Sequence, residues 1–212
     1  GVALGVGVVC AIDLANGAAL AAFEAAEAAI AGKATHQIVA PGGLDETLLA
    51  RLRAAGVRPS APVVEGYATV LGPAPRTVRL LGVDPFSEPP FRPYAAPPRA
   101  DDARALAALL VEPGAVAATA EGARLLGLAP GAAFELRVEG VVRRARLARI
   151  VDPGSDFERR ALDDVLVADV AAAQELLGSA GRLTRIDLLA PPGAAGEATL
   201  AKARALLPPG AE

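Results

Sequence analysis

The sequence contains few of the side chains that carry redox, metal or acid–base chemistry. Its 212 residues include one cysteine, Cys10, and one histidine, His36, with no methionine and no tryptophan. A single thiol cannot form an intramolecular disulfide or a thiolate zinc site, and a single histidine excludes metal motifs built on a histidine pair. His36 lies on a predicted strand, so we expect it to be a hydrogen-bonded structural side chain.

A basic surface is also missing. The chain has 21 Lys and Arg against 24 Asp and Glu, a formal net charge of −3, and almost all of its cations are arginines. This balance argues against nucleic acid as a partner, because phosphate neutralisation needs a concentrated basic patch. Aromatic residues make up only 3% of the chain, whereas branched aliphatics and alanine recur throughout. The sequence therefore predicts a folded core of Leu, Val and Ala rather than a disordered chain.

Motifs of common enzymes are absent from the sequence. It has no Walker A run, and none of its four serines stands in a GxSxG motif. Carboxylates gather between 152 and 164, but Arg159 and Arg160 lie among them, which is typical of a solvated loop rather than a metal or glycosidase site. We therefore expect no catalytic, cofactor-binding or metal-binding residues, no cofactor, and a chain that is not an enzyme.

The N-terminal residues 1–12 carry no charge. They are too few to span a bilayer, which needs about 20 apolar residues, and they lack the basic start and cleavage site of a signal peptide. We interpret them as the end of a clipped transmembrane helix; an ordinary buried segment is the alternative. An alanine-faced helix is predicted from Asp13 to Gly32, either as a rigid extension of that membrane helix or as a plain packing helix.

The rest of the chain predicts an α+β fold, because hairpins and helices alternate without a doubly wound order. Pro59 and Pro62 should confine the start of the strand at 57–71 to an edge or a bulge. The Pro-rich stretch 85–98 predicts a hinge or linker fixed by its aromatics. The predicted strands are 35–40, 57–71, 77–83, 116–118, 133–138, 141–151, 165–168 and 183–190, and the predicted helices after Gly32 are 45–55, 101–110, 121–126, 170–177 and 197–207.

Arginines at 144, 146 and 149 form a basic stripe on the predicted strand 141–151. We expect this stripe to be a solvated face or to pair with Glu135 and Glu139 on the neighbouring strand; a specific anionic partner is the alternative.

Several stretches together resemble the extracytoplasmic core domain of MacB/FtsX-type ABC transporter permeases. The resemblance rests on order and spacing and covers nearly the whole chain. The stretches are VVCAIDLANGAALAAFEAAEAAIAGKATHQIVAPGGLDETLLARL, APVVEGYATV, LLGVDPFSEPPFR, AVAATAEGARLLGLAPGAAFEL and VLVADVAAAQELLGSAGRLTRIDLL.

The resemblance implies a two-lobed periplasmic domain. Residues 1–12 would end a membrane helix, 13–96 and 156–212 would form a discontinuous first lobe of mixed sheet and helix, and 97–155 would form an inserted, smaller α/β lobe. The chain would be the extracytoplasmic, noncatalytic part of an inner-membrane permease that couples cytoplasmic ATP hydrolysis to export or extraction at the cell envelope.

The implied partners are a cytoplasmic ABC ATPase subunit, reached through the rest of the permease, and a second permease copy or repeat. A periplasmic adaptor, or a lipoprotein, lipid or peptide substrate, is also implied. The alternative function is a soluble two-lobed domain that binds a small molecule, or an enzyme, with a pocket near the Pro-rich hinge.

Overall fold

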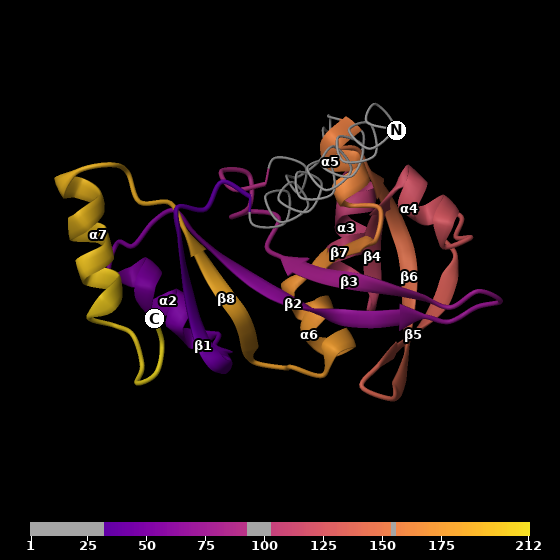
Figure 1. Ribbon diagram of the computed structural model, residues 1–212, viewed down its shortest axis with the longest axis horizontal. Coiled ribbons are helices and arrows are strands. Elements are labelled where there is room, and N and C mark those ends of the chain that lie inside the picture. The colour runs from indigo at the N-terminus through magenta and orange to yellow at the C-terminus, as the bar shows by residue number, and fades with distance from the viewer. Residues whose placement is uncertain (1–31, 93–102, 154–155) are drawn as a thin grey trace, which may run out of the picture.

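The computed structural model describes residues 32–92, 103–153 and 156–212 (Figure 1). The predicted membrane segment 1–12, residues 13–31 of the helix that follows it and residues 93–98 of the Pro-rich stretch lie outside the described residues. Within the described ranges, no helix combines the length and the apolar character that crossing a bilayer requires.

Eight strands and six helices are described. The strands are β1 (His36–Asp45), β2 (Ser60–Val70), β3 (Arg76–Val83), β4 (Ala115–Thr119), β5 (Ala133–Val138), β6 (Val141–Val151), β7 (Val165–Asp169) and β8 (Arg182–Leu188). The helices are α2 (Thr47–Ala54), α3 (Ala103–Val111), α4 (Ala120–Leu125), α5 (Asp156–Ala161), α6 (Val170–Leu177) and α7 (Ala194–Arg204).

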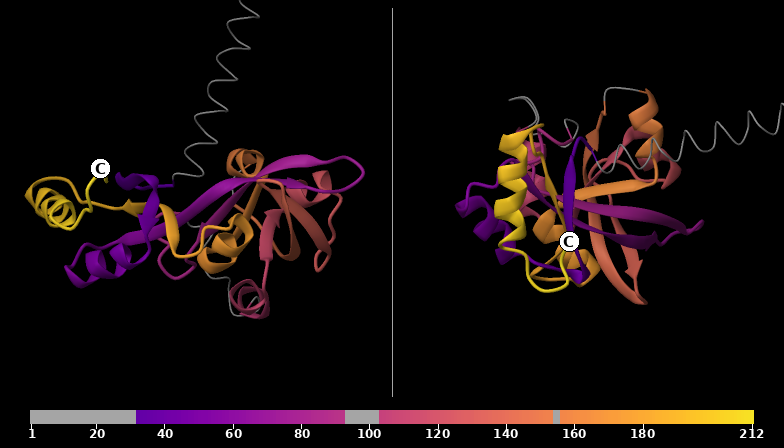
Figure 2. Two further views of the ribbon diagram at one scale, coloured as in Figure 1. Left: turned by 90° about the horizontal axis from the view of Figure 1, so that it is seen from below. Right: turned by 60° about the vertical axis from the view of Figure 1, so that its left-hand side comes forward.

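All eight strands join one mixed sheet in the order β1-β8-β2-β3-β7-β4-β6-β5. The pairs β3–β7 and β4–β6 are parallel, and the other neighbours are antiparallel. A further short pairing of β2 with β5 closes the last six strands into a ring, whereas β1 and β8 extend from it beside α2 and α7 (Figures 1 and 2). The predicted α+β class is confirmed.

The pairing of β2 changes along its length. Ser60–Val63 pair with β8, and Val63–Val70 pair with β3. Pro62 thus lies ahead of the ladder to β3, where the N–H that proline lacks is not required on that side. The hairpin predicted from 57–71 and 77–83 is the β2–β3 pair.

The central strands are buried on both faces, which explains their continuous apolar sequences. Along β3, Leu80 belongs to one core cluster and its neighbour Leu81 to another, because successive side chains point to opposite faces. Ala173 of α6 packs into the first cluster, and Leu109 of α3 packs into the second. Helices therefore cover the ring of strands on two sides.

Most predicted elements differ from the structure by one to three residues at an end, and three differences concern β1, α5 and α7. β1 does not end at Ala40 but continues through Pro41-Gly42-Gly43, with a register shift between Val39 and Leu44. The guanidinium of Arg182 donates to the carbonyl oxygens of Gly42 (2.5 Å) and Gly43 (2.8 Å) and holds this bulge against β8. The predicted polar loop after Asp152 contains the helix α5, and the last helix begins at Ala194 instead of Glu197.

The division into lobes at 97 and 155 stays a prediction. Strand ladders cross these limits, because β4 pairs with β7 and β5 pairs with β2. Any two lobes drawn there share one continuous sheet.

Candidate functional site

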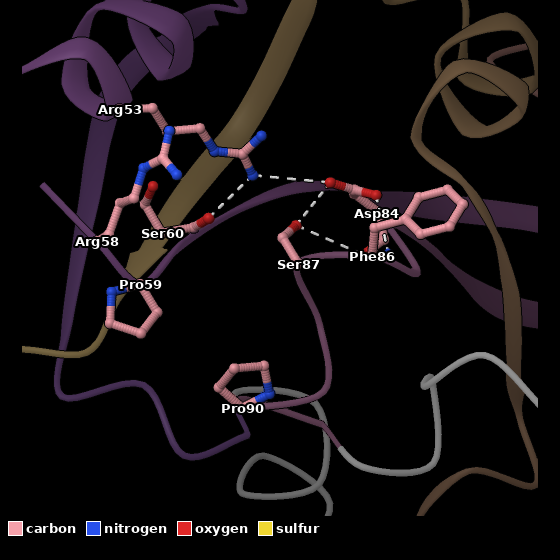
Figure 3. Close-up of a pocket in the computed structure, with 8 residues that line it drawn as sticks. All are labelled: Arg53, Arg58, Pro59, Ser60, Asp84, Phe86, Ser87 and Pro90. Carbon is pink, nitrogen blue, oxygen red and sulfur yellow. Dashed lines mark hydrogen bonds and ion pairs between the residues drawn. The ribbon is translucent and has the colours of Figure 1, made fainter. Parts of the chain in front are cut away.

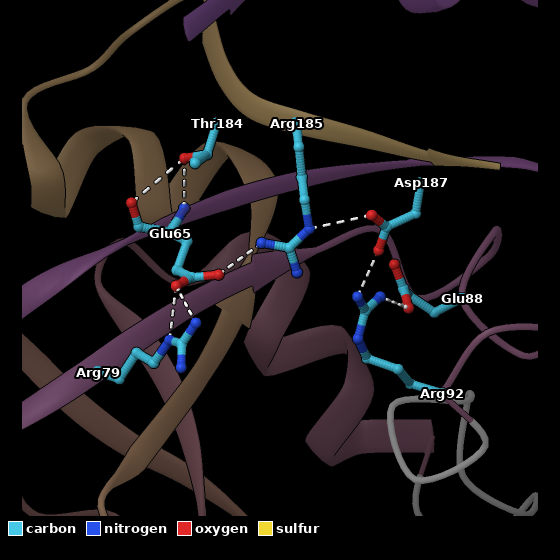
Figure 4. A network of polar contacts seen from close by, with 7 residues as sticks. All are labelled: Glu65, Arg79, Glu88, Arg92, Thr184, Arg185 and Asp187. Atoms are coloured by element: carbon cyan, nitrogen blue, oxygen red, sulfur yellow. Dashed lines mark hydrogen bonds and ion pairs between the residues drawn. The ribbon is translucent and has the colours of Figure 1, made fainter. Parts of the chain in front are cut away.

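Six charged side chains form a connected network inside the molecule, where β2, β3 and β8 meet the segment 84–92 that follows β3 (Figure 4). Carboxylates and guanidinium groups alternate along it, so that each arginine lies between acids or beside one. We call it the ion network; its members are Glu65, Arg79, Glu88, Arg92, Arg185 and Asp187.

Glu65 of β2 joins two arginines from its neighbouring strands. Arg79 Nε on β3 donates to Glu65 Oε1 at 2.6 Å, and Arg185 Nη1 on β8 donates to Glu65 Oε2 at 2.6 Å. Thr184 fixes the backbone of Glu65, because its Oγ1 accepts from the N–H of Glu65 (2.8 Å) and donates to the carbonyl (3.2 Å). This carboxylate therefore links three strands of the sheet.

Asp187 continues the network into the interior. Its Oδ1 accepts from Arg185 Nε at 3.0 Å, and its Oδ2 accepts from Arg92 Nη2. Arg92 Nη1 donates in turn to Glu88 Oε2 at 2.7 Å. The side chains of Asp187, Arg92 and Glu88 have no solvent exposure. Buried charges are tolerated when each is paired, so loss of one partner in this set should be costly.

Glu88 is the member of the ion network whose hydrogen-bonding groups are not all paired. Its Oε1 is buried without a hydrogen-bond partner, and Arg92 is shared with Asp187. Burial raises the pKa of Glu88 from 4.5 to about 7, against the opposing effect of Arg92. The carboxyl group therefore takes up a proton near neutral pH, whereas the surface acid Glu121 has its pKa lowered by a hydrogen bond from Arg124.

The first residues of the described chain, Gly32 and Lys33, contact the segment 84–92. The N–H of Lys33 donates to the carbonyl of Phe91 at 3.0 Å, and Phe91 is fully buried. Gly32 has φ +66°, and a Cβ there would lie 2.7 Å from the Phe91 carbonyl oxygen and 2.8 Å from Arg92 Cγ. Only glycine fits this left-handed, crowded position. The chain ahead of β1 is therefore joined directly to the residues that carry the ion network.

A pocket of about 390 Å³ lies between α2, the start of β2 and the segment 84–92 (Figure 3). Arg53 of α2 lines it: its Nη2 donates to the carbonyl of Ser60 at 3.0 Å and lies 3.6 Å from Asp84 Oδ2. Asp84 also accepts from the N–H of Phe86 (3.0 Å) and from Ser87 Oγ (2.7 Å). The lining residues are Arg53, Arg58, Pro59, Ser60, Asp84, Phe86, Ser87 and Pro90.

The residues examined for catalysis in the sequence are not brought together. His36 is exposed at the start of β1, with Nδ1 3.1 Å from its neighbour Thr35 Oγ1. Ser87 bonds to Asp84, and Ser60 is buried at the start of β2. Among the described residues, no group of three or more His, Cys, Asp or Glu side chains is placed to hold a metal ion.

The acidic stretch and the basic stripe have ordinary structural contacts. Asp163 accepts from Thr119 Oγ1 at 2.9 Å, and Asp164 lies 3.5 Å from Arg76. Arg146 Nη1 donates to Glu112 at 2.7 Å, not to the predicted Glu135 or Glu139. Glu112 lies outside the hairpin, just after α3, so strand pairing alone did not predict this partner.

The ion network was not predicted, although the sequence carries a signal for it. Glu65, Arg79 and Asp187 each interrupt an apolar strand sequence, and a charged side chain among buried neighbours needs a partner of opposite sign. Which charges pair depends on the strand order, which the sequence alone did not supply.

Comparison with known proteins identifies relatives of the chain. It is 37% identical over 191 residues to the uncharacterized ABC transporter permease protein Rv0987 of Mycobacterium tuberculosis; the match covers 89% of this chain and 22% of that protein. The chain thus spans about a fifth of that relative's length. No family model matches the sequence.

A solved structure shares its fold. The crystal structure of the extracellular domain of the noncanonic ABC-type transporter YknZ from Gram-positive bacteria aligns with a TM-score of 0.54 and 12% identity, covering 80% of this chain and 91% of that one. The periplasmic region of MacB from Actinobacillus actinomycetemcomitans aligns with a TM-score of 0.49 and 12% identity, covering 85% of each chain. The chain is therefore similar in sequence to part of an ABC transporter permease protein, and it shares the fold of the YknZ extracellular domain.

Proposed function

We propose that this chain transmits movement between the membrane part of an ABC permease and its own sheet when a cytoplasmic ATPase subunit hydrolyses ATP. The proposed partners are that ATPase, a second permease copy or repeat, and a periplasmic adaptor or a lipoprotein, lipid or peptide that is exported or extracted. The 37% identity to a permease supports an ATPase partner.

The observation that carries the proposal is the contact of Gly32 and Lys33 with Phe91 and Arg92. From Arg92 the ion network leads to Asp187 on β8 and then through Arg185 to Glu65 on β2. Because these side chains are buried and paired, a displacement of Gly32 that moves Arg92 either moves β8 with it or separates buried charges. Separating buried charges costs free energy, so we expect β8 and β2 to move together with Arg92.

The proposed membrane attachment precedes this contact. We propose that residues 1–12 end a membrane helix, that the helix from Asp13 to Gly32 extends it outward, and that the lobes are 13–96 with 156–212 and 97–155. In this arrangement Gly32 is where the extension meets the folded domain.

The experiment that tests the proposal uses the full-length parent permease and its ATPase in lipid nanodiscs. Backbone hydrogen exchange is measured by mass spectrometry without nucleotide and in the ATP-bound, vanadate-trapped state. We expect a nucleotide-dependent change in protection at β8 and at the first half of β2. The variant Gly32→Ala should reduce that change while ATP hydrolysis continues.

The matched control is Gly56→Ala. Gly56 also has a positive φ, +81°, but a Cβ there has nothing within 4 Å. This variant should keep the nucleotide-dependent change. Equal protection in both nucleotide states throughout β2 and β8, or an undiminished change in Gly32→Ala, would contradict the proposal.

A second candidate function is binding of a small molecule by a self-contained domain. It is supported by the pocket at Asp84, Phe86, Ser87 and Pro90, which lies at the start of the Pro-rich stretch. The two functions differ in the parent reading frame, because the first requires membrane segments and an ATPase gene beside it.

A further inference from the structure

We propose that the pocket between α2 and the segment 84–92 binds an anionic amphiphile, that is, a phosphate or carboxylate headgroup joined to a short apolar chain. The inference rests on the second candidate function, binding of a small molecule at this pocket, and not on the proposed transmission of movement.

The headgroup side of the pocket is cationic. Arg53 and Arg58 both line it, and the carboxylate of Asp84 is the one acidic group among the lining residues, which leaves one net positive charge. Asp84 already accepts from the N–H of Phe86 and from Ser87 Oγ. Arg58 is exposed and forms no hydrogen bond or ion pair with any described residue. Guanidinium groups bind phosphate and carboxylate oxygens through paired N–H donors.

A buried hydroxyl provides a further polar group at the same place. Ser60 is 4% exposed, lines the pocket, and its Oγ has no hydrogen-bond partner among the described residues. Buried hydroxyls nearly always have a partner, so Ser60 Oγ is an unused hydrogen-bonding group at the wall of the pocket.

The pocket also has apolar lining residues. Phe86 is 69% exposed, although phenylalanine is usually buried; it lies beside Asp84 and Ser87, whereas Pro59 lies beside Arg58 and Ser60 (Figure 3). Pro90 lines the pocket as well. An apolar chain next to the headgroup would cover these surfaces and gain from their removal from water. The volume of about 390 Å³ lies within the usual range of small-ligand pockets.

A second arginine-lined cavity provides an internal comparison. It has a volume of about 640 Å³, and Arg143 and Arg144 line it beside Glu175. None of its lining residues is aromatic. If charge alone selected the ligand, this cavity would serve as well as the first.

The test is calorimetric titration of the full 212-residue chain with octyl phosphate below its micelle concentration. Inorganic phosphate and octyl glucoside are titrated in parallel, to separate the anion and the alkyl chain. We expect saturable binding of octyl phosphate that is at least about tenfold tighter than binding of either of the other two ligands.

Two variants locate the binding. Arg58→Gln and Phe86→Ala change exposed side chains, so both should fold, and each should weaken octyl phosphate binding several-fold to about tenfold. The matched controls are Arg51→Gln, an exposed arginine of α2 outside the pocket, and Arg143→Gln in the second cavity. Both controls should bind as the wild type does.

Four results would overturn the inference. They are no binding of octyl phosphate, equal affinity for inorganic phosphate, equal affinity for octyl glucoside, and unchanged affinity in both Arg58→Gln and Phe86→Ala. Equal affinity for inorganic phosphate would assign the pocket to a free anion instead of an amphiphile.

Discussion

Arg92 and Asp187 are 95 residues apart in the sequence, yet they form an ion pair from which solvent is fully excluded. The pair joins the segment after β3 to the strand β8. Arg92 also bonds to Glu88, so one cation serves two buried carboxylates.

Replacing that cation should destabilise the fold strongly. In Arg92→Met, Asp187 keeps Arg185 but Glu88 loses its partner, and we expect a loss of about 3–5 kcal/mol in the free energy of unfolding. Urea denaturation followed by circular dichroism measures it. The control is Arg124→Met, which breaks an exposed pair with Glu121 and should cost no more than about 1 kcal/mol. Similar losses in both variants would show that the buried ion pair contributes no more to stability than the exposed one.

The pH dependence of stability should report on Glu88. Its pKa in the folded chain is about 7, above the ordinary value of 4.5, so between these values the folded state binds more protons than the unfolded state. The contribution of Glu88 is thus fully present below pH 4.5 and is lost as the pH rises to about 7. At 1.36 kcal/mol per pKa unit, the loss is on the order of 3 kcal/mol.

The variant Glu88→Gln should lack this loss. Its unfolding free energy, compared with that of the wild type, should rise between pH 4.5 and 7 and change little above that range. Glu121→Gln is the control with the opposite sign, because a hydrogen bond from Arg124 lowers the pKa of Glu121. A difference between Glu88→Gln and wild type that is constant with pH would refute the protonation of Glu88.

The contact at Gly32 can be measured by a pair of alanine substitutions. Gly32→Ala meets the Phe91 carbonyl and Arg92 Cγ, whereas Gly56→Ala meets nothing within 4 Å, and both positions have positive φ. Gly56→Ala should cost about 1–2 kcal/mol from the left-handed backbone alone. Gly32→Ala should cost at least 1 kcal/mol more, by thermal or urea unfolding. Equal costs would mean that Gly32 does not pack on the segment 84–92.

The packing of α6 on the β2–β3 hairpin gives a further pair. A Cβ at Gly82 would lie 2.3 Å from Ala173 Cβ, whereas a Cβ at Gly66 would meet only the flexible end of Leu177. We expect Gly82→Ala to lower the free energy of unfolding by about 2–3 kcal/mol, because the helix that carries Ala173 must shift to make room. Gly66→Ala should cost clearly less, because Leu177 can change its rotamer instead. Unfolding curves of both variants measure the two losses of stability. A larger loss in Gly66→Ala than in Gly82→Ala would contradict the described packing of α6 on the hairpin.

Local patterns in the sequence predicted much of the fold. The strands 133–138 and 141–151 have the predicted limits, because alternating apolar residues flank a glycine turn at Gly140. The helix after Asp169 is also as predicted, with Asp169 accepting from the N–H of Ala171 at 3.0 Å. In each case the information lies within a few neighbouring residues.

What was missed depends on contacts between distant residues. β1 passes Pro41-Gly42-Gly43 because Arg182, on another strand, bonds to the glycine carbonyls. The ion network needs the order of β3, β2 and β8, and the pocket needs α2 beside the segment 84–92. Of the predicted hinge aromatics, Phe91 is buried as expected but Phe86 is exposed, a difference that only the surrounding structure determines.

The ring of β2, β3, β7, β4, β6 and β5 limits where another chain can add a strand. Each strand of the ring has a neighbour on both sides, although β2 and β5 pair only at Thr69 with Arg137 and at Val70 with Leu136. The exposed edge of the sheet is β1, where Val39 already exchanges two backbone hydrogen bonds with Glu212 (2.9 and 3.0 Å). Addition of a strand from another chain is thereby directed to one bulged strand that the C-terminal residue Glu212 already partly covers.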